Sequence, residues 1–211
     1  MDTPEILDVG AGTGRFLKLF AQAGWKVTGA EPNPEYYKYL KNEFKTISQV
    51  RITQESFQDL HYTSQFDMIL SINGPFSYLL TTEDRESAIE KAYKALTKDG
   101  ILLIDTSNFS WILKNYQDPK SQFFNLDGKS VEHNIVHEFD FNNNILTHID
   151  IFKIQGQVDV RSVHEFYMIG FPEIEYFLKK VQFRNISTYN SYEATEPCPI
   201  DHKRLLVVAQ K

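Results

Sequence analysis

The glycine-rich stretch Asp8-Val9-Gly10-Ala11-Gly12-Thr13-Gly14 has the residue types and spacing that most clearly indicate chemistry. It follows a short apolar run typical of a buried strand and precedes an amphipathic helical pattern. Glycines allow a backbone to turn sharply and to approach a ligand closely. The free N–H groups and the dipole at the beginning of a helix favour an anionic ligand group. The stretch therefore predicts a nucleotide-binding turn, and a turn that binds nothing is the alternative.

The spacing of the glycines distinguishes between nucleotides. Dinucleotide-binding turns follow the pattern G-x-G-x-x-G. Here the pattern is G-x-G-x-G, Arg15 stands where the last glycine would fall, and Asp8 precedes the first glycine by two positions. These differences favour S-adenosylmethionine over NAD.

Two further polar segments are expected at the same site. Glu31 closes the predicted second strand, where its carboxylate can accept hydrogen bonds from the 2′ and 3′ hydroxyls of a ribose. A solvated residue at a helix entry is the alternative. The stretch 54–60 follows the third strand and can clamp an adenine ring, with Phe57 in apolar contact. A loop that merely anchors Phe57 in the core is the alternative there.

Alternating apolar runs and helical patterns predict βα units and a parallel sheet. Strands are expected at residues 6–9, 25–30, 50–53, 66–70, 101–105, 183–189 and 204–209. Helices are expected at residues 14–23 and 34–44, from 82 to a stop at Gly100, and from Pro172 onward. Between residues 131 and 168 the period changes to two, which predicts an antiparallel insertion of strands at 131–139, 145–154 and 158–168.

Residues 6–14 resemble motif I of the class I S-adenosylmethionine-dependent methyltransferases, and residues 66–71 and 100–105 resemble the fourth and fifth strands of that family. The resemblance implies a Rossmann-like α/β fold, with a doubly wound, mostly parallel seven-stranded sheet whose last strand is antiparallel. It implies one domain over residues 1–211, divided into a cofactor-binding half at 1–110, an acceptor-side insertion at 111–170 and a C-terminal part at 171–211. The implied cofactor-binding residues are Asp8, Gly10, Ala11, Gly12, Thr13, Gly14, Glu31, Pro32, Glu55, Ser56, Phe57, Ser71, Ile72 and Asn73.

Two departures from the family pattern concern the cover of the site. Ser56 stands where the family commonly has an Asp that contacts the adenine amine, a role that Glu55 could take. Family members usually carry a helical segment before the first strand, whereas Ile6 stands almost at the beginning of this chain. Either the chain is a fragment, or the cover comes from elsewhere, for example from residues 131–168.

In-line methyl transfer needs a base only when the acceptor must lose a proton. Tyr78 and His164 are the candidate catalytic residues. His133, His137 and His148, on the predicted insertion, are weaker candidates. Five aromatic residues could line an acceptor pocket or simply pack: Phe109, Trp111, Tyr116, Phe123 and Phe124. No metal site is expected.

Composition narrows the function classes. The chain has 211 residues, a formal net charge of −6 and one cysteine, Cys198, so it can form no intrachain disulfide. An acidic chain without a basic run is not expected to bind nucleic acid, and no apolar stretch predicts a membrane span or a signal peptide. We therefore expect a cytoplasmic enzyme with a small-molecule acceptor, methylated on N, O or C. An NAD-dependent oxidoreductase and a catalytically silent binding module are the alternatives.

Overall fold

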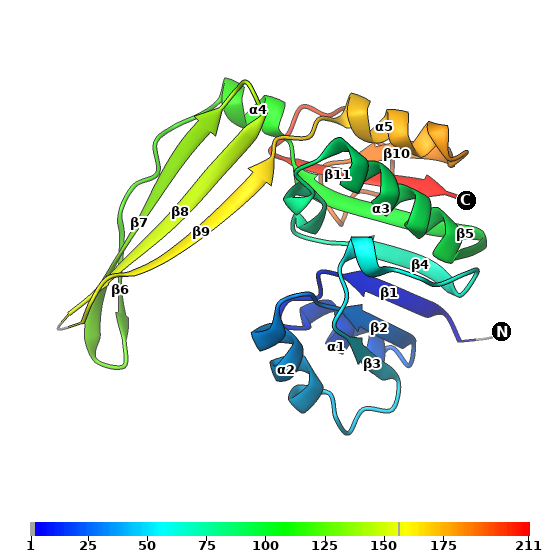
Figure 1. The fold of residues 1–211 in the computed structure, drawn as a ribbon, viewed down its shortest axis with the longest axis horizontal. Helices are drawn as coiled ribbons and strands as arrows, with labels where there is room; N and C mark the ends of the chain where they lie inside the picture. Colours follow the sequence, from blue (N-terminus) through cyan, green and yellow to red (C-terminus); the bar gives the residue numbers. More distant parts are fainter. Residues whose placement is uncertain (1–2, 156) are drawn as a thin grey trace.

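The computed structural model describes residues 3–155 and 157–211, which contain two sheets (Figure 1). The strands of the first sheet are β1 Glu5–Val9, β2 Lys26–Ala30, β3 Val50–Thr53, β4 Phe66–Ser71, β5 Leu96–Ser107, β10 Arg184–Tyr189 and β11 Arg204–Gln210. Their spatial order is β10-β11-β5-β4-β1-β2-β3. The first five strands run parallel, whereas β11 is antiparallel to both β5 and β10. The expected Rossmann-like sheet is confirmed.

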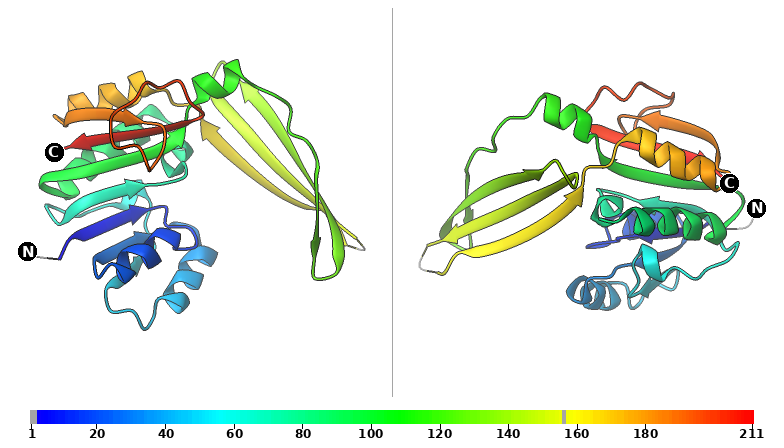
Figure 2. Two further views of the ribbon diagram at one scale, coloured as in Figure 1. Left: turned by 180° about the vertical axis from the view of Figure 1, so that it is seen from behind. Right: turned by 45° about the horizontal axis from the view of Figure 1, so that its top comes forward.

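Helices cover both faces of this sheet (Figures 1 and 2). They are α1 Arg15–Gln22, α2 Pro34–Glu43, α3 Thr82–Ala95 and α5 Phe171–Lys180, with two 3-10 turns, η1 Phe57–Asp59 and η2 Pro75–Tyr78. Neighbouring strand residues point to opposite faces. Ile6 packs with Leu17 of α1 in one core cluster, and Leu7 packs with Ile89 of α3 in the other.

The second sheet is an antiparallel meander of β6 Gln122–Leu126, β7 Lys129–Asp140, β8 Ile145–Ile154 and β9 Val160–Tyr167. It follows β5 and the short helix α4 Phe109–Lys114, and it extends away from the end of the first sheet (Figure 2). A small cluster of Phe109, Leu146 and Met168 packs at its base. The expected antiparallel insertion is therefore confirmed.

Three local predictions were incomplete or wrong. Helix α3 ends at Ala95 rather than at Gly100, because Leu96 already has extended dihedrals and pairs with Phe66. Gly100 is instead a point of close approach, where an added Cβ would lie 3.0 Å from the carbonyl oxygen of Thr97.

The other two are elements that the sequence pattern missed. Strand β6 is exposed along its whole length, so it shows no alternation between buried and solvated positions. Helix α4 has only six residues, too few for a helical period, and its recognisable signal is the cap at Asn108, whose side chain accepts a hydrogen bond from Trp111 N.

Candidate functional site: a nucleotide cavity at the carboxyl ends of the strands

The three glycines of the turn between β1 and α1 have two different roles. Gly10, Gly12 and Gly14 all have positive φ, at 79°, 57° and 80°. A Cβ on Gly10 would lie 2.5 Å from Pro75 Cγ, and one on Gly14 would lie 2.6 Å from Phe44 Cε2, so both positions allow close packing. A Cβ on Gly12 would meet nothing within 4 Å, because Gly12 faces open space. Gly12 is thus the glycine that leaves room for a ligand.

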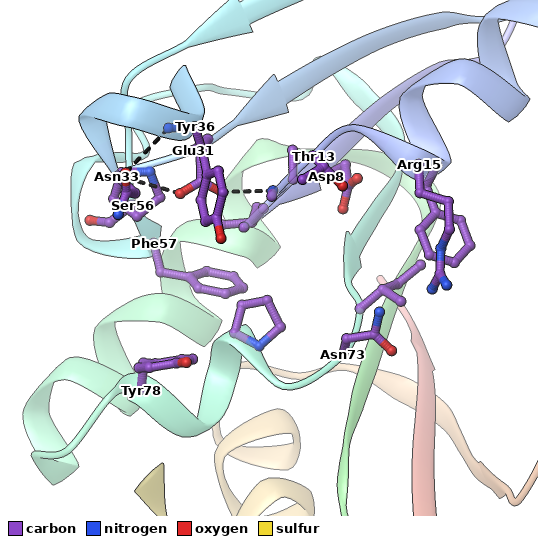
Figure 3. A pocket seen from close by; sticks show the side chains of 18 of the residues that line it. Asp8, Thr13, Arg15, Glu31, Asn33, Tyr36, Ser56, Phe57, Asn73 and Tyr78 are labelled. Atoms are coloured by element: carbon purple, nitrogen blue, oxygen red, sulfur yellow. Dashed lines mark hydrogen bonds between the residues drawn. The ribbon is translucent and has the colours of Figure 1, made fainter. Parts of the chain in front are cut away.

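Glu31 connects this turn to the tip of β2. Its side chain is 5% exposed, its Oε2 accepts a hydrogen bond from Gly12 N at 2.7 Å, and its Oε1 accepts one from Asn33 N at 2.9 Å (Figure 3). An ionised carboxylate has about four acceptor positions. Each oxygen therefore retains capacity for a ligand hydroxyl.

A cavity of about 650 Å³ lies in front of this turn, within the range of small-molecule sites. Of the residues predicted from sequence, those that line it are Asp8, Gly10, Ala11, Gly12, Thr13, Glu31, Pro32, Ser56, Phe57, Ile72, Asn73, Tyr78 and His164. Figure 3 shows Glu31, Phe57 and Tyr36 toward one side of the cavity, and Asp8, Arg15 and Asn73 toward the other. The structure thus gathers residues from five separate segments around one space.

Three of the predicted residues do not line the cavity. Gly14 is buried against Leu40 and Phe44. Glu55 accepts a hydrogen bond from Tyr62 Oη at 2.7 Å, which engages the carboxylate proposed for the adenine contact. Ser71 is fully buried, and its Oγ has no hydrogen-bond partner among the described residues.

Ser56 lines the cavity but its hydroxyl is already engaged. Ser56 Oγ donates to Asp59 Oδ2 at 2.6 Å, and the same carboxylate accepts from Ser56 N, which caps η1. The hydrogen bonds from Ser56 lower the pKa of Asp59. Gln58, which belongs to the predicted segment 54–60, also lines the cavity, and its side-chain amide is suited to an adenine edge.

Val9 and Gln58 also line the cavity, and both lie in segments that the sequence singled out. Six further lining residues were not named as candidates: Arg15, Phe16, Asn33, Tyr36, Pro75 and Leu79. The sequence contained a signal for two of these residues, Asn33 and Tyr36. Asn33 caps α2 by accepting hydrogen bonds from Glu35 N and Tyr36 N, so the cap places Tyr36 in the first turn beside Glu31. Proximity to a helix cap could have identified both.

Asp8 is the most perturbed acid of the site. It lies at the carboxyl end of β1 and is 2% exposed. Burial, and then the negative charge of Glu31, raise the pKa of Asp8 to about 7. A cationic group in the cavity would favour the ionised form, so this carboxyl is suited to an ammonium group.

Asn73 is held at the end of β4 by a buried acid. It has a positive φ of 65°, and its N–H donates to Asp105 Oδ2 at 2.9 Å. The same carboxylate accepts from Arg204 Nη1 at 2.8 Å and from the hydroxyl of Tyr192. Asp105 thereby fixes the turn at Asn73, which borders this cavity and also a second one.

The second of these cavities has about 1080 Å³ and lies between the end of β5, α4 and the second sheet. It shares Asn73 with the first cavity. Of the aromatic residues suggested for an acceptor pocket, Phe109, Trp111 and Tyr116 line it, whereas Phe123 and Phe124 are exposed on β6.

The candidate bases divide between the two cavities. His164 and Tyr78 line the first, where Tyr78 Oη and His164 Nδ1 lie 2.9 Å apart. His137 and His148 line the second. Burial, followed by Tyr36 and nearby acids, raises the pKa of Tyr78, so its hydroxyl stays protonated at neutral pH. Among the described residues, no three His, Cys, Asp or Glu side chains form a metal-binding group.

Comparisons with known proteins found similar sequences and similar folds. The sequence matches the family described as "Methyltransferase domain" over residues 6–100. The glycine/sarcosine N-methyltransferase of Halorhodospira halochloris is 26% identical over 202 residues, which cover 90% of this chain and 69% of that protein.

Two solved structures have the same fold. The CcbJ methyltransferase of Streptomyces caelestis superposes with a TM-score of 0.84 at 15% identity, covering 99% of this chain and 89% of that one. The S-adenosylmethionine-bound amino pentose methyltransferase CalS10 of Micromonospora echinaspora has a TM-score of 0.80 at 17% identity, covering 99% and 84%.

A glycine turn that faces open space, an acidic residue at the tip of β2 and a mostly parallel sheet with an antiparallel last strand are typical of nucleotide-binding α/β proteins. The family match over residues 6–100, together with the fold, supports a class I S-adenosylmethionine-dependent methyltransferase. The curated relative and both solved structures are named as methyltransferases, and CalS10 was solved with S-adenosylmethionine bound. The oxidoreductase alternative is thereby set aside. None of the described helices has the length and apolar character needed to cross a membrane.

Proposed function

We propose that this chain methylates a nitrogen atom of a small-molecule amine. The relatives reported above are named for glycine and sarcosine, with nitrogen as the methylated atom, and for an amino pentose. The observation that carries the proposal in this chain is the carboxylate of Glu31, which holds Gly12 N at 2.7 Å on the wall of a cavity of about 650 Å³.

The residues that would hold the cofactor follow from the two sides of this cavity. Glu31 would accept hydrogen bonds from the ribose hydroxyls, with Pro32 beside it and Phe57 in apolar contact with the adenine. Ser56 and Gln58 border the same side.

The opposite side of the cavity would hold the amino-acid portion. Asp8 would pair with the ammonium group, and Ile72 and Asn73 would lie beside the methionine chain. The turn residues Gly10, Ala11, Gly12 and Thr13 would approach the ligand through their backbone. Bound there, the cofactor supplies an activated methyl group on a sulfonium. The task of the protein is to hold the acceptor in line with that group.

The acceptor would enter from the second cavity, because Asn73 borders both spaces. His164 and Tyr78, which are hydrogen-bonded to each other, would border the acceptor at the mouth of the first cavity, with its reacting nitrogen toward the second cavity. The aromatic wall of Phe109 and Trp111 would exclude water from its apolar part.

Two measurements test the proposal. Calorimetry with S-adenosylmethionine should show one site per chain, and Gly12→Val should abolish that binding. The wild-type protein, incubated with S-adenosylmethionine and a panel of small amines and their hydroxyl counterparts, should form S-adenosylhomocysteine with an amine. Turnover with the hydroxyl compounds alone would refute the nitrogen assignment, and turnover with neither would refute the small-molecule assignment.

A further inference from the structure

One face of the second sheet carries a row of three histidines. His137 pairs with His148 across β7 and β8, and His148 pairs with His164 across β8 and β9. His148 and His164 have ring centroids 6.4 Å apart. Because His164 lines the first cavity and the other two line the second, the row spans both cavities.

Two histidines of this row, His137 and His148, belong to a longer chain of hydrogen bonds. His137 Nε2 lies 2.9 Å from His148 Nδ1, and His148 Nε2 lies 3.1 Å from Asp150 Oδ2. Asp150 Oδ1 lies 2.6 Å from His133 Nε2. At the other end, His137 Nδ1 lies 3.3 Å from Tyr116 Oη, which lines the second cavity.

The carboxylate of Asp150 determines the tautomer of each ring in this chain. An ionised carboxylate only accepts hydrogen bonds, so His148 must carry its proton on Nε2 and leave Nδ1 as an acceptor. His137 then donates to it from Nε2, and its own Nδ1 is an acceptor. Tyr116 Oη, which lies 3.3 Å from that nitrogen, can donate its hydroxyl proton to it. The hydroxyl oxygen of Tyr116, at the end of the chain that borders the second cavity, therefore keeps a lone pair that can accept a proton.

We propose that Tyr116, His137, His148, Asp150 and His133 form a proton relay that takes up the proton that the amine loses on methylation. The proposal rests on the proposed function, and it deepens it by requiring an acceptor that still carries a removable proton. His137, with Tyr116, would be the group that receives this proton. Asp150 would be a positioning residue that acts through His148.

Electrostatics support both ends of the relay. Burial, and then the neighbouring His148, lower the pKa of His137, so this ring is neutral at pH 7 and able to accept a proton. Burial opposes ionisation of Asp150, but the hydrogen bonds and charges of His133 and His148 outweigh it and lower the pKa of Asp150. The neutral ring of His137 is thus connected through His148 to the ionised carboxylate of Asp150, and this negative charge stabilises an imidazolium.

Other titratable groups also face this region. Burial, and then the charge and hydrogen bond of Asp118, raise the pKa of Tyr116, and the charge of Asp118 partly offsets the lowering of the pKa of His137. The residues that line the second cavity also include Asp105, His202, Lys203 and Arg204. Of these, Asp105 and Arg204 are paired with each other.

The proton balance is simple. As the nitrogen gains a bond to the methyl carbon, its bond to one hydrogen breaks, and that proton passes to Tyr116 Oη. The hydroxyl proton of Tyr116 passes to His137 Nδ1, which forms an imidazolium opposite Asp150. A further shift of the Nε2 protons moves the charge along the chain, and the proton leaves to water after the product.

The test compares Asp150→Asn and His137→Gln with Glu138→Gln. Glu138 is exposed on β7, one position after His137 and therefore on the other face of the sheet, so its substitution is a matched control. With S-adenosylmethionine and a small amine at pH 7, both relay variants should lower kcat by about 100-fold, the usual scale of acid–base catalysis. The Kd for S-adenosylmethionine should stay within twofold.

The pH profile distinguishes a relay from a structural role. Above the pKa of the amine itself, the free base can react without assistance, so the deficit of Asp150→Asn should shrink as pH rises from 7 to 10. A deficit that is constant across this range, or an unchanged kcat in both relay variants, would overturn the relay.

Nitrogen NMR of the imidazole rings gives a readout that needs no turnover. In the wild-type protein, His137 and His148 should carry protons on Nε2 and none on Nδ1, and Asp150→Asn should lower the pKa of His137 further. Protonated Nδ1 on His137 would overturn the relay whatever the activity. A wild-type protein that forms no S-adenosylhomocysteine with any amine would instead refute the proposed function.

Discussion

Replacement of Glu31 by alanine is the most informative perturbation of the cofactor site. The carboxylate accepts two backbone hydrogen bonds, from Gly12 N at 2.7 Å and from Asn33 N at 2.9 Å. It thus has a structural role in the turn in addition to its proposed contact with the ribose. The two roles predict effects of different size.

The binding effect should be the larger one. Hydrogen bonds to a charged group contribute about 1.5–3 kcal/mol. Since about 1.4 kcal/mol corresponds to a factor of ten, Glu31→Ala should raise the Kd for S-adenosylmethionine roughly 10- to 150-fold. Gly12 is only partly buried, so water can replace the lost carboxylate at its N–H. The free energy of unfolding of the ligand-free protein should therefore fall by only about 1 kcal/mol.

Calorimetry with S-adenosylmethionine and urea denaturation of the ligand-free protein measure the two effects separately. Glu43→Ala, at the exposed end of α2, is the matched control and should change neither. A Kd for Glu31→Ala within twofold of the wild-type value would refute the ribose contact. A loss of stability that exceeds the loss of binding would show that Glu31 serves mainly to shape the turn.

Three further outcomes are expected. Gly12→Val should abolish cofactor binding while the far-ultraviolet circular dichroism stays unchanged, because its Cβ would enter open space in the cavity. Arg85→Met should lower the free energy of unfolding by about 3 kcal/mol in urea, because Arg85 is 1% exposed, pairs with Glu173 and donates to the carbonyl oxygen of Leu79 at 2.7 Å. The folded-state pKa of Asp8 is raised to about 7, so the folded protein binds the extra proton and its stability should decline as pH rises from about 4 to 7. Asp8→Asn should remove that part of the pH dependence in urea titrations at each pH, and an identical decline in the variant would count against the raised pKa.

Local patterns in the sequence were sufficient for the first four strands of the fold. Strand β3 has the predicted bounds, and β1, β2 and β4 differ from prediction by one residue at an end. Parallel strands buried on both faces give continuous apolar runs, which are easy to recognise. Exposed β6 and the short α4 lack such a signal, and the prediction missed both.

The candidate site could be predicted where its residues lie close together in the chain. The glycine turn and Glu31 follow consecutive strands, and the carboxyl ends of parallel strands meet at one edge of a sheet. Glu55 shows where this reasoning stops. Its position suggested an adenine contact, but Tyr62 Oη donates to it at 2.7 Å, and the side chain does not line the cavity.

The sequence by itself determined the nucleotide-binding turn, because the spacing of Gly10, Gly12 and Gly14 after a buried strand is a local property of the backbone, and the resemblance of residues 6–14 to motif I implied the methyltransferase class. Only the tertiary structure decided which side chains meet across the second sheet. His137, His148 and His164 form a row because the registers of β7, β8 and β9 align them, and a slip of one residue would turn a histidine to the other face. That alignment depends on packing between strands distant in the chain, which no spacing along the sequence specifies.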